Sequence, residues 1–93
     1  MIQSFADKDS ERVWHRLHVR RFGADWQRVA NRKLLMLDAA ETINDLRGPP
    51  GNRLEQQQGD RKGQYSIRTN DQWRICFTRT LAGPIDVQIT DYH

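Results

Sequence analysis

The sequence predicts an α+β domain in which two N-terminal helices pack on one face of a small antiparallel β-sheet. Before Gly48, apolar residues recur every three or four positions; after it, they alternate with polar residues. The segment Gly48-Pro49-Pro50-Gly51-Asn52 separates the two patterns, because proline and glycine interrupt helices. A chain of 93 residues has the length of one domain, so we expect residues 1–93 to form a single unit.

The N-terminal half predicts a short strand at residues 2–5, followed by the two helices. Asp7, Asp9 or Ser10 can cap the first helix, which should run to about residue 18 before Gly23 interrupts the pattern. Asp25 can cap the second helix, which is expected at about residues 26–47. One buried stripe should follow this helix, formed by Trp26, Val29, Ala30, Leu34, Leu37, Ala40 and Ile43.

The C-terminal half predicts three strands, at residues 64–69, 72–79 and 85–92, joined by short turns into an antiparallel meander. A further short strand is expected around residues 53–54. One sheet face should be apolar and receive the helices: Tyr65, Ile67, Trp73, Ile75, Phe77, Ile85, Val87 and Ile89. The opposite face should be open to solvent and carry Ser66, Arg68, Arg74, Cys76, Thr78, Asp86, Gln88 and Tyr92. Two arginines and an aromatic residue on an open sheet face suit an RNA-binding surface.

The chain is basic, with a net charge of +3 and a pI of about 9.5. Twelve of its fifteen basic residues are arginines, whose planar guanidinium pairs with phosphate and stacks on bases. This composition favours a nucleic acid or an acidic protein as the partner. A single cysteine, Cys76, excludes an internal disulfide and fits a reducing cytoplasm, and we expect it to be a packing residue. No cysteine or histidine spacing suggests a zinc site, and we expect no cofactor, membrane-spanning helix or signal peptide.

Several segments together resemble the HigB (host inhibition of growth) toxins of the RelE/ParE superfamily. They are MIQSF, RKLLMLDAAETINDLR, PPGNRLE, GQYSIRTNDQWRICF and ITDYH, and they cover almost the whole chain in the family's order. The resemblance implies a RelE-like fold and ribosome-dependent cleavage of messenger RNA without a metal ion. It also implies a helix-turn-helix antitoxin (HigA-like) as partner, through which operator DNA would be contacted only indirectly.

The resemblance also implies candidate site residues. The terminal Asp-Tyr-His of the family corresponds to Asp91, Tyr92 and His93, and the basic positions of its strand pair correspond to Arg68 and Arg74. His93 would carry a proton, and the two arginines would hold the scissile phosphate. Asp91 would orient a neighbour or pair with an arginine, and Tyr92 would stack on or position a base.

One position departs from the family pattern. Some members carry a catalytic histidine on the strand after the helices, whereas this chain has Glu55 there, which could replace it as the base. Further contacts with RNA or the ribosome are expected from basic residues outside this group, namely Arg53, Arg61, Lys62 and Arg79.

Alternative interpretations remain open at this level. ParE-like relatives inhibit DNA gyrase and are not nucleases; the ending Asp91-Tyr92-His93 argues against this activity, and Glu55 keeps it possible. The chain could instead be a non-catalytic RNA-binding regulator, in which the arginines matter and the terminal histidine does not. His15 and His18 are expected to be surface residues or contacts with the antitoxin.

Overall fold

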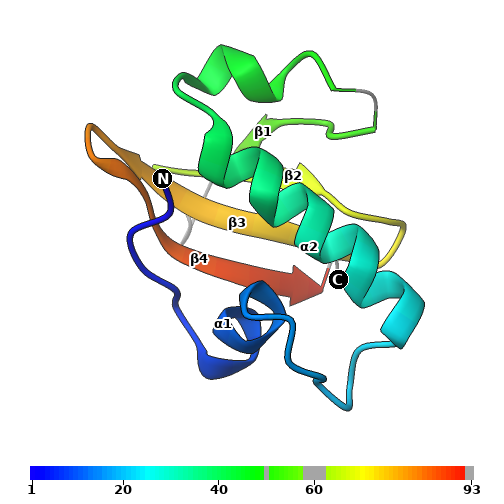
Figure 1. Cartoon of the computed structure of the whole chain (residues 1–93). Coiled ribbons are helices and arrows are strands. Elements are labelled where there is room, and N and C mark those ends of the chain that lie inside the picture. Colours follow the sequence, from blue (N-terminus) through cyan, green and yellow to red (C-terminus); the bar gives the residue numbers. More distant parts are fainter. Residues whose placement is uncertain (50, 58–62, 92–93) are drawn as a thin grey trace.

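A computed structural model of the chain describes residues 1–49, 51–57 and 63–91. Its elements are α1 (Lys8–Trp14), α2 (Ala24–Ala39), the 3₁₀ helix η1 (Ile43–Leu46), β1 (Glu55–Gln56), β2 (Gln64–Arg68), β3 (Trp73–Thr80) and β4 (Gly83–Asp91). The four strands lie in the order β1-β2-β3-β4, and each neighbouring pair is antiparallel. Figure 1 shows α2 lying across one face of this sheet, with α1 beside β4. The predicted α+β class is confirmed.

Both helices are shorter than predicted at their C-terminal ends. Helix α1 begins at the N-cap Asp7, whose carboxylate accepts a hydrogen bond from the Ser10 N–H at 2.7 Å. It ends at Trp14, and Arg16 then adopts a left-handed backbone conformation with φ of 63°. The N-cap of α2 is Gly23 rather than Asp25, which lies in the first turn.

A second capping structure explains why α2 ends early. The predicted helix to residue 47 is wrong, because Ala40 is extended and a separate 3₁₀ turn, η1, follows. Thr42 and Asp45 form a capping box, in which each side chain accepts a hydrogen bond from the backbone of the other residue. This box begins a new helical turn within a segment whose apolar spacing would also fit a continuous helix.

Asp45 makes the stability of η1 depend on pH. The backbone N–H groups of Thr42 and Glu41 donate to its carboxylate at 3.0 and 2.9 Å, and these bonds lower the pKa of Asp45 from 3.8. Because the folded-state pKa is the lower one, the stabilisation is present above about pH 4 and is lost as pH falls through the folded-state pKa. Urea unfolding should therefore show Asp45→Asn to be less stable than the parent at pH 7, with a smaller difference at pH 3. A difference that is equal at both pH values would contradict this assignment.

The N-terminal segment covers the outer edge of β4. Phe5 forms a parallel bridge with Val87, where the prediction had a strand at residues 2–5. The Gln3 N–H donates to the Pro84 carbonyl at 2.8 Å, which extends the pairing toward the β3–β4 turn. Gly83 there has φ of +135°, and a Cβ atom at this position would collide with the Met1 carbonyl. The segment thus protects an edge strand that would otherwise expose unpaired backbone groups.

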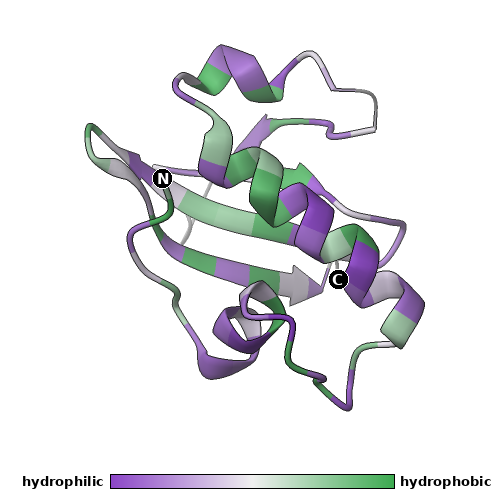
Figure 2. Ribbon diagram, viewed as in Figure 1, coloured by the Kyte–Doolittle hydropathy of each residue, from purple (hydrophilic) through white to green (hydrophobic). Residues whose placement is uncertain are grey.

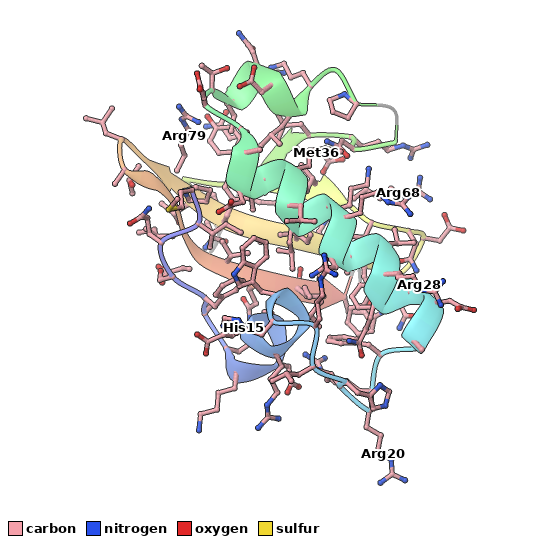
Figure 3. All side chains as sticks on the ribbon, viewed as in Figure 1. His15, Arg20, Arg28, Met36, Arg68 and Arg79 are labelled. Carbon is pink, nitrogen blue, oxygen red and sulfur yellow. The ribbon has the colours of Figure 1, made fainter. Side chains whose placement is uncertain are left out.

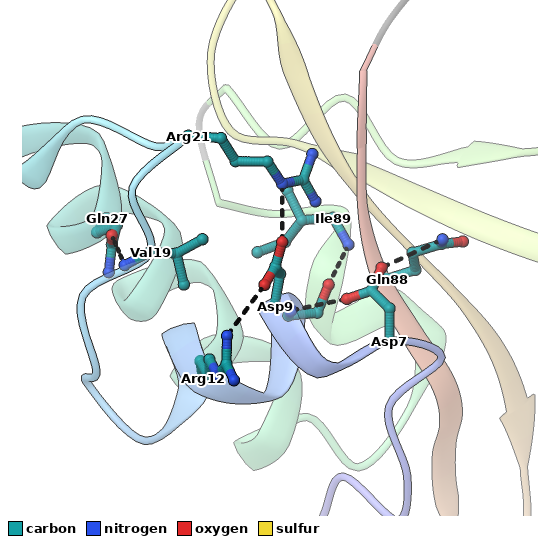
Figure 4. Close-up of polar contacts among 9 residues, drawn as sticks. Asp7, Asp9, Arg12, Val19, Arg21, Gln27, Gln88 and Ile89 are labelled. Atoms are coloured by element: carbon teal, nitrogen blue, oxygen red, sulfur yellow. Dashed lines mark hydrogen bonds and ion pairs between the residues drawn. The ribbon is translucent and has the colours of Figure 1, made fainter.

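Helix α1 is bound to β4 by polar contacts, drawn in Figure 4. The buried Ser10 hydroxyl accepts a hydrogen bond from the Ile89 N–H at 2.9 Å, and the Asp7 carboxylate accepts one from the Gln88 side-chain amide at 3.3 Å. These bonds fix the short helix in place, since seven residues alone would not form a stable helix.

One core lies between α2 and the sheet. Its buried members are Val13, Val19, Phe22, Ala30, Leu34, Leu37, Leu46, Ile67, Ile75, Phe77, Val87 and Ile89. Figure 2 shows the matching alternation of apolar and polar residues along β4. The apolar face that was predicted for β2 and β3 is confirmed, because Ile67 and Ile75 are cross-strand partners in this core.

A β-bulge corrects the predicted face of Ile85. Cys76 pairs with Gln88, but Thr78 pairs with Ile85, so β4 holds one more residue than β3 at this point. Asp86, in the bulge, has φ of 53°. The extra residue reverses the alternation, and Ile85 therefore lies on the face of Thr78 and Cys76, outside the core cluster.

The face of the sheet that α2 does not cover, here called the helix-free face, is less open than predicted. Ser66 and Cys76 are buried at its centre. The Gln57 side-chain amide donates to the Ser66 hydroxyl at 2.7 Å, and the Cys76 sulfur lies 3.3 Å from the Thr90 hydroxyl. Polar side chains therefore bond to one another across this face.

Candidate active site

Strand register brings three of the candidate residues together on the helix-free face. Arg68 of β2 and Arg74 of β3 are direct cross-strand partners. Glu55 of β1 pairs with Ser66, two residues from Arg68 and on the same face. These three residues, here called the Arg–Arg–Glu cluster, come from three neighbouring strands and meet only in the folded sheet.

Ion pairs hold the cluster. The Arg74 Nη2 atom lies 3.0 Å from Glu55 Oε2, with the Arg74 side chain 12% exposed and that of Glu55 52% exposed. Arg68 pairs with the carboxylate of Asp71, and its Nε atom donates to the Asn70 carbonyl at 3.1 Å. Like charges directly opposite each other on a sheet repel, and the two carboxylates offset that repulsion. The strand register thus places two arginines at directly opposite positions, and guanidinium groups are suited to pairing with an anion such as phosphate.

Asn52 is a buried structural residue beside the cluster that the sequence does not single out. It is buried, its amide donates to the Leu46 carbonyl at 3.1 Å, and its side-chain oxygen accepts a bond from the Lys33 ammonium. Its own carbonyl accepts the Arg68 N–H at 2.6 Å. Burial, followed by the charge of Arg32, lowers the pKa of Lys33. Asn52 thus joins α2, η1 and β2 immediately before Glu55; in the sequence, Gly51-Asn52 after two prolines indicates only a turn.

Replacement of Asn52 should destabilise the protein. Asn52→Ala leaves the Lys33 ammonium and the Leu46 carbonyl without their partner, and we expect the free energy of unfolding to fall by ~1–3 kcal/mol. Asn44→Ala is the matched control, because Asn44 is exposed and should change stability by less than ~0.5 kcal/mol. Urea denaturation followed by circular dichroism measures both; equal effects would contradict the role of Asn52.

Three of the other candidate residues, Asp91, Arg53 and Arg79, lie in the described part of the chain. Asp91 ends β4 opposite Trp73 and accepts a hydrogen bond from the Gln72 amide at 3.4 Å, whereas the residue opposite Arg74 is Thr90. Four further candidates, Arg61, Lys62, Tyr92 and His93, lie outside the described residues.

The two remaining basic candidates differ in distance from the cluster. Arg53 is exposed, with φ of 44°, and precedes Glu55 by two residues. Arg79 lies at the far end of β3, where its Nη2 atom donates to the Glu41 carbonyl at 3.1 Å. Figure 3 shows Arg79 and Arg68 well separated, so the structure does not bring Arg79 into the Arg–Arg–Glu cluster.

The described residues contain neither a cluster of metal-binding side chains nor a helix that could span a membrane. Across residues 1–49, 51–57 and 63–91, no three His, Cys, Asp or Glu side chains gather closely enough to hold a metal ion. Within the same ranges, no helix has the length and apolar character needed to cross a membrane.

Comparison with known proteins identifies the family. The model of the RelE-like toxin of type II toxin-antitoxin system HigB matches residues 3–93. Toxin HigB-1 of Vibrio cholerae serotype O1 is 56% identical over 46 residues, which are 50% of this chain and 48% of that protein. An uncharacterized protein of Haemophilus influenzae is 48% identical over 50 residues, which are 54% of this chain and 50% of that protein. The alignments therefore span about half the length of each relative. Because the family match covers nearly the whole chain and the helices and antiparallel sheet agree with a RelE-like fold, the chain belongs to the RelE-like HigB toxins of type II toxin–antitoxin systems.

Proposed function

We propose that this protein cleaves messenger RNA on the ribosome, without a metal ion, and thereby inhibits translation and growth. The observation that carries the proposal is the Arg–Arg–Glu cluster, which offers two cationic groups and a carboxylate on one face of a rigid sheet. Toxins of type II systems have an antitoxin partner, and we propose a helix-turn-helix protein in this role. The place of action would be the cytoplasm, where ribosomes translate.

The reaction would use the substrate's own 2′-hydroxyl. Its oxygen attacks the adjacent phosphorus, the bond from phosphorus to the 5′ oxygen breaks, and the products are a 2′,3′-cyclic phosphate and a 5′-hydroxyl. The transition state carries extra negative charge on the phosphorane oxygens. Arg68 and Arg74 would stabilise this charge, because guanidinium groups fixed in advance need no reorganisation during the reaction.

Two proton transfers complete the reaction. Glu55 would accept the proton of the 2′-hydroxyl, since its carboxylate is half exposed and lies 3.0 Å from the Arg74 guanidinium that would bind the phosphate. His93 would protonate the leaving 5′ oxygen, with Tyr92 positioning a base and Asp91 orienting a neighbour. The ribosome would supply the substrate geometry, because a shallow site on a small domain cannot itself fix the RNA for in-line attack.

Analysis of the RNA ends tests this chemistry. Cleavage products from programmed ribosomes should carry a 2′,3′-cyclic phosphate, and Glu55→Gln should slow their formation by ~10²-fold or more. Glu11→Gln is the control, because Glu11 is exposed on α1 and this substitution also removes one negative charge, but at a position outside the cluster. A 5′-phosphate product would contradict attack by the 2′-hydroxyl. Full activity of the Glu55→Gln variant would show that Glu55 is not the base.

A further inference from the structure

A basic groove lies in the helical layer of the molecule, between α2 and the segment that connects α1 to α2. It has a volume of about 490 Å³, and its lining includes Arg16, His18, Arg28 and Arg32. Arg28 and Arg32 are one turn apart on α2. Arg16 follows α1 and has a left-handed backbone conformation. None of these residues belongs to the Arg–Arg–Glu cluster.

The groove has a local excess of positive charge. In the part of the chain that the structure describes, neither Arg16 nor Arg32 forms an ion pair with a carboxylate. Arg28 pairs at 3.3 Å with Asp25, whose side chain is fully exposed, so water screens this pair. By contrast, Arg74 is largely buried against its carboxylate. The groove is therefore complementary to an acidic ligand.

The groove also has apolar character and fixed walls. Leu35 of α2 and Val13 of α1 contribute to its lining, and Leu35 is 46% exposed whereas Val13 is buried. The Gln27 side chain accepts a hydrogen bond from the Val19 N–H at 2.8 Å, as Figure 4 shows. The Asn31 amide donates to the Val13 carbonyl at 3.1 Å. These amides hold the groove in shape.

This combination favours a protein over RNA as the ligand. Arginines around an exposed leucine match the usual makeup of protein interfaces, where a buried apolar anchor is surrounded by charged residues. Phosphate contacts would use the arginines but leave Leu35 exposed.

We propose that this groove binds an acidic segment of the antitoxin, with carboxylates against Arg16, Arg28 and Arg32 and an apolar side chain against Leu35. The inference rests on membership of a toxin–antitoxin family and does not depend on the nuclease chemistry. It assigns the inhibitor a binding site built from α1 and α2 rather than from the Arg–Arg–Glu cluster.

Calorimetric titration with the antitoxin encoded in the reading frame beside the toxin gene tests the proposal. The double variant Arg28→Glu, Arg32→Glu should bind this antitoxin ~100-fold more weakly or worse, because two attractive contacts become repulsive. The double variant Arg20→Glu, Arg47→Glu has the same net charge, changes exposed residues outside the groove lining, and should stay within ~3-fold of the parent. Leu35→Ala should weaken binding by ~10-fold, whereas Leu81→Ala, at the exposed β3–β4 turn, should not.

Other outcomes overturn the proposal. Unchanged antitoxin affinity in the groove variant, together with lost co-sedimentation with ribosomes, would assign the groove to RNA. Equal losses in both double variants would indicate attraction to overall charge without a specific site. The messenger-cleavage assay on the same proteins keeps the two proposals separate: a parent protein that does not cut RNA, but whose groove variant loses antitoxin, would contradict only the nuclease function.

Discussion

Arg74→Ala should reduce the rate of messenger cleavage on programmed ribosomes by ~10²–10³-fold, the usual cost of removing one fixed group that stabilises transition-state charge. Arg74→Lys should recover only part of this loss, because lysine keeps the charge but cannot offer two parallel N–H groups to a phosphate. Single-turnover primer extension measures the rates. Arg20→Ala is the control, since it removes an exposed arginine elsewhere on the surface.

The Arg74 variant should remain folded. Removing Arg74 leaves Glu55 without this ion pair, but the Glu55 carboxylate is half exposed and can be hydrated, so the expected cost is below ~1 kcal/mol. Circular dichroism and a thermal melt check this point. Loss of cleavage with an intact fold would support a direct role of Arg74 at the phosphate. Unchanged cleavage would contradict that role.

Phe22→Ala should have the largest effect on stability, a loss of ~3–5 kcal/mol from a total of ~5–15 kcal/mol. Phe22 is buried, and its ring lies 4.6 Å from that of Trp26 and 5.1 Å from that of Trp73, measured between ring centroids. The Arg21 guanidinium covers it at 4.4 Å and also bonds to Asp9. The ring therefore joins α2, β3 and the α1–α2 connection.

Tryptophan fluorescence during urea unfolding measures this loss, because two of the three tryptophans contact Phe22. Leu81→Ala serves as the control, since that side chain is fully exposed and should change stability by less than ~0.5 kcal/mol. An effect of Phe22→Ala as small as that of Leu81→Ala would contradict the assignment of this cluster to the core.

The regular parts of the fold could be predicted because their apolar periods are undisturbed. Alternation along residues 64–80 identifies β2 and β3, and the short connection between them implies the antiparallel pairing that brings Arg68 beside Arg74. The end of α2 could not be located in this way, because Ala40 and Ile43 continue the helical spacing through the capping box that interrupts it.

Two other features depend on tertiary contacts. The bulge at Asp86 reverses the face of Ile85, and simple alternation carries no signal for an inserted residue. Burial of Asn52 depends on Lys33 and Leu46, which are distant from it in the sequence or belong to a turn that was not predicted. The proposed role of Glu55 follows from the family resemblance, and its ion pair with Arg74 depends on the order of the strands in the sheet.

Primer extension on a defined messenger, with and without programmed ribosomes, tests the central proposal most directly. The parent protein should produce cuts within ribosome-bound codons and none in free RNA, and both Arg74→Ala and His93→Ala should lose these cuts while remaining folded. If the parent makes no cuts although growth still stops in cells, the nuclease proposal is contradicted, and inhibition of another target, with DNA gyrase first, becomes the explanation to test.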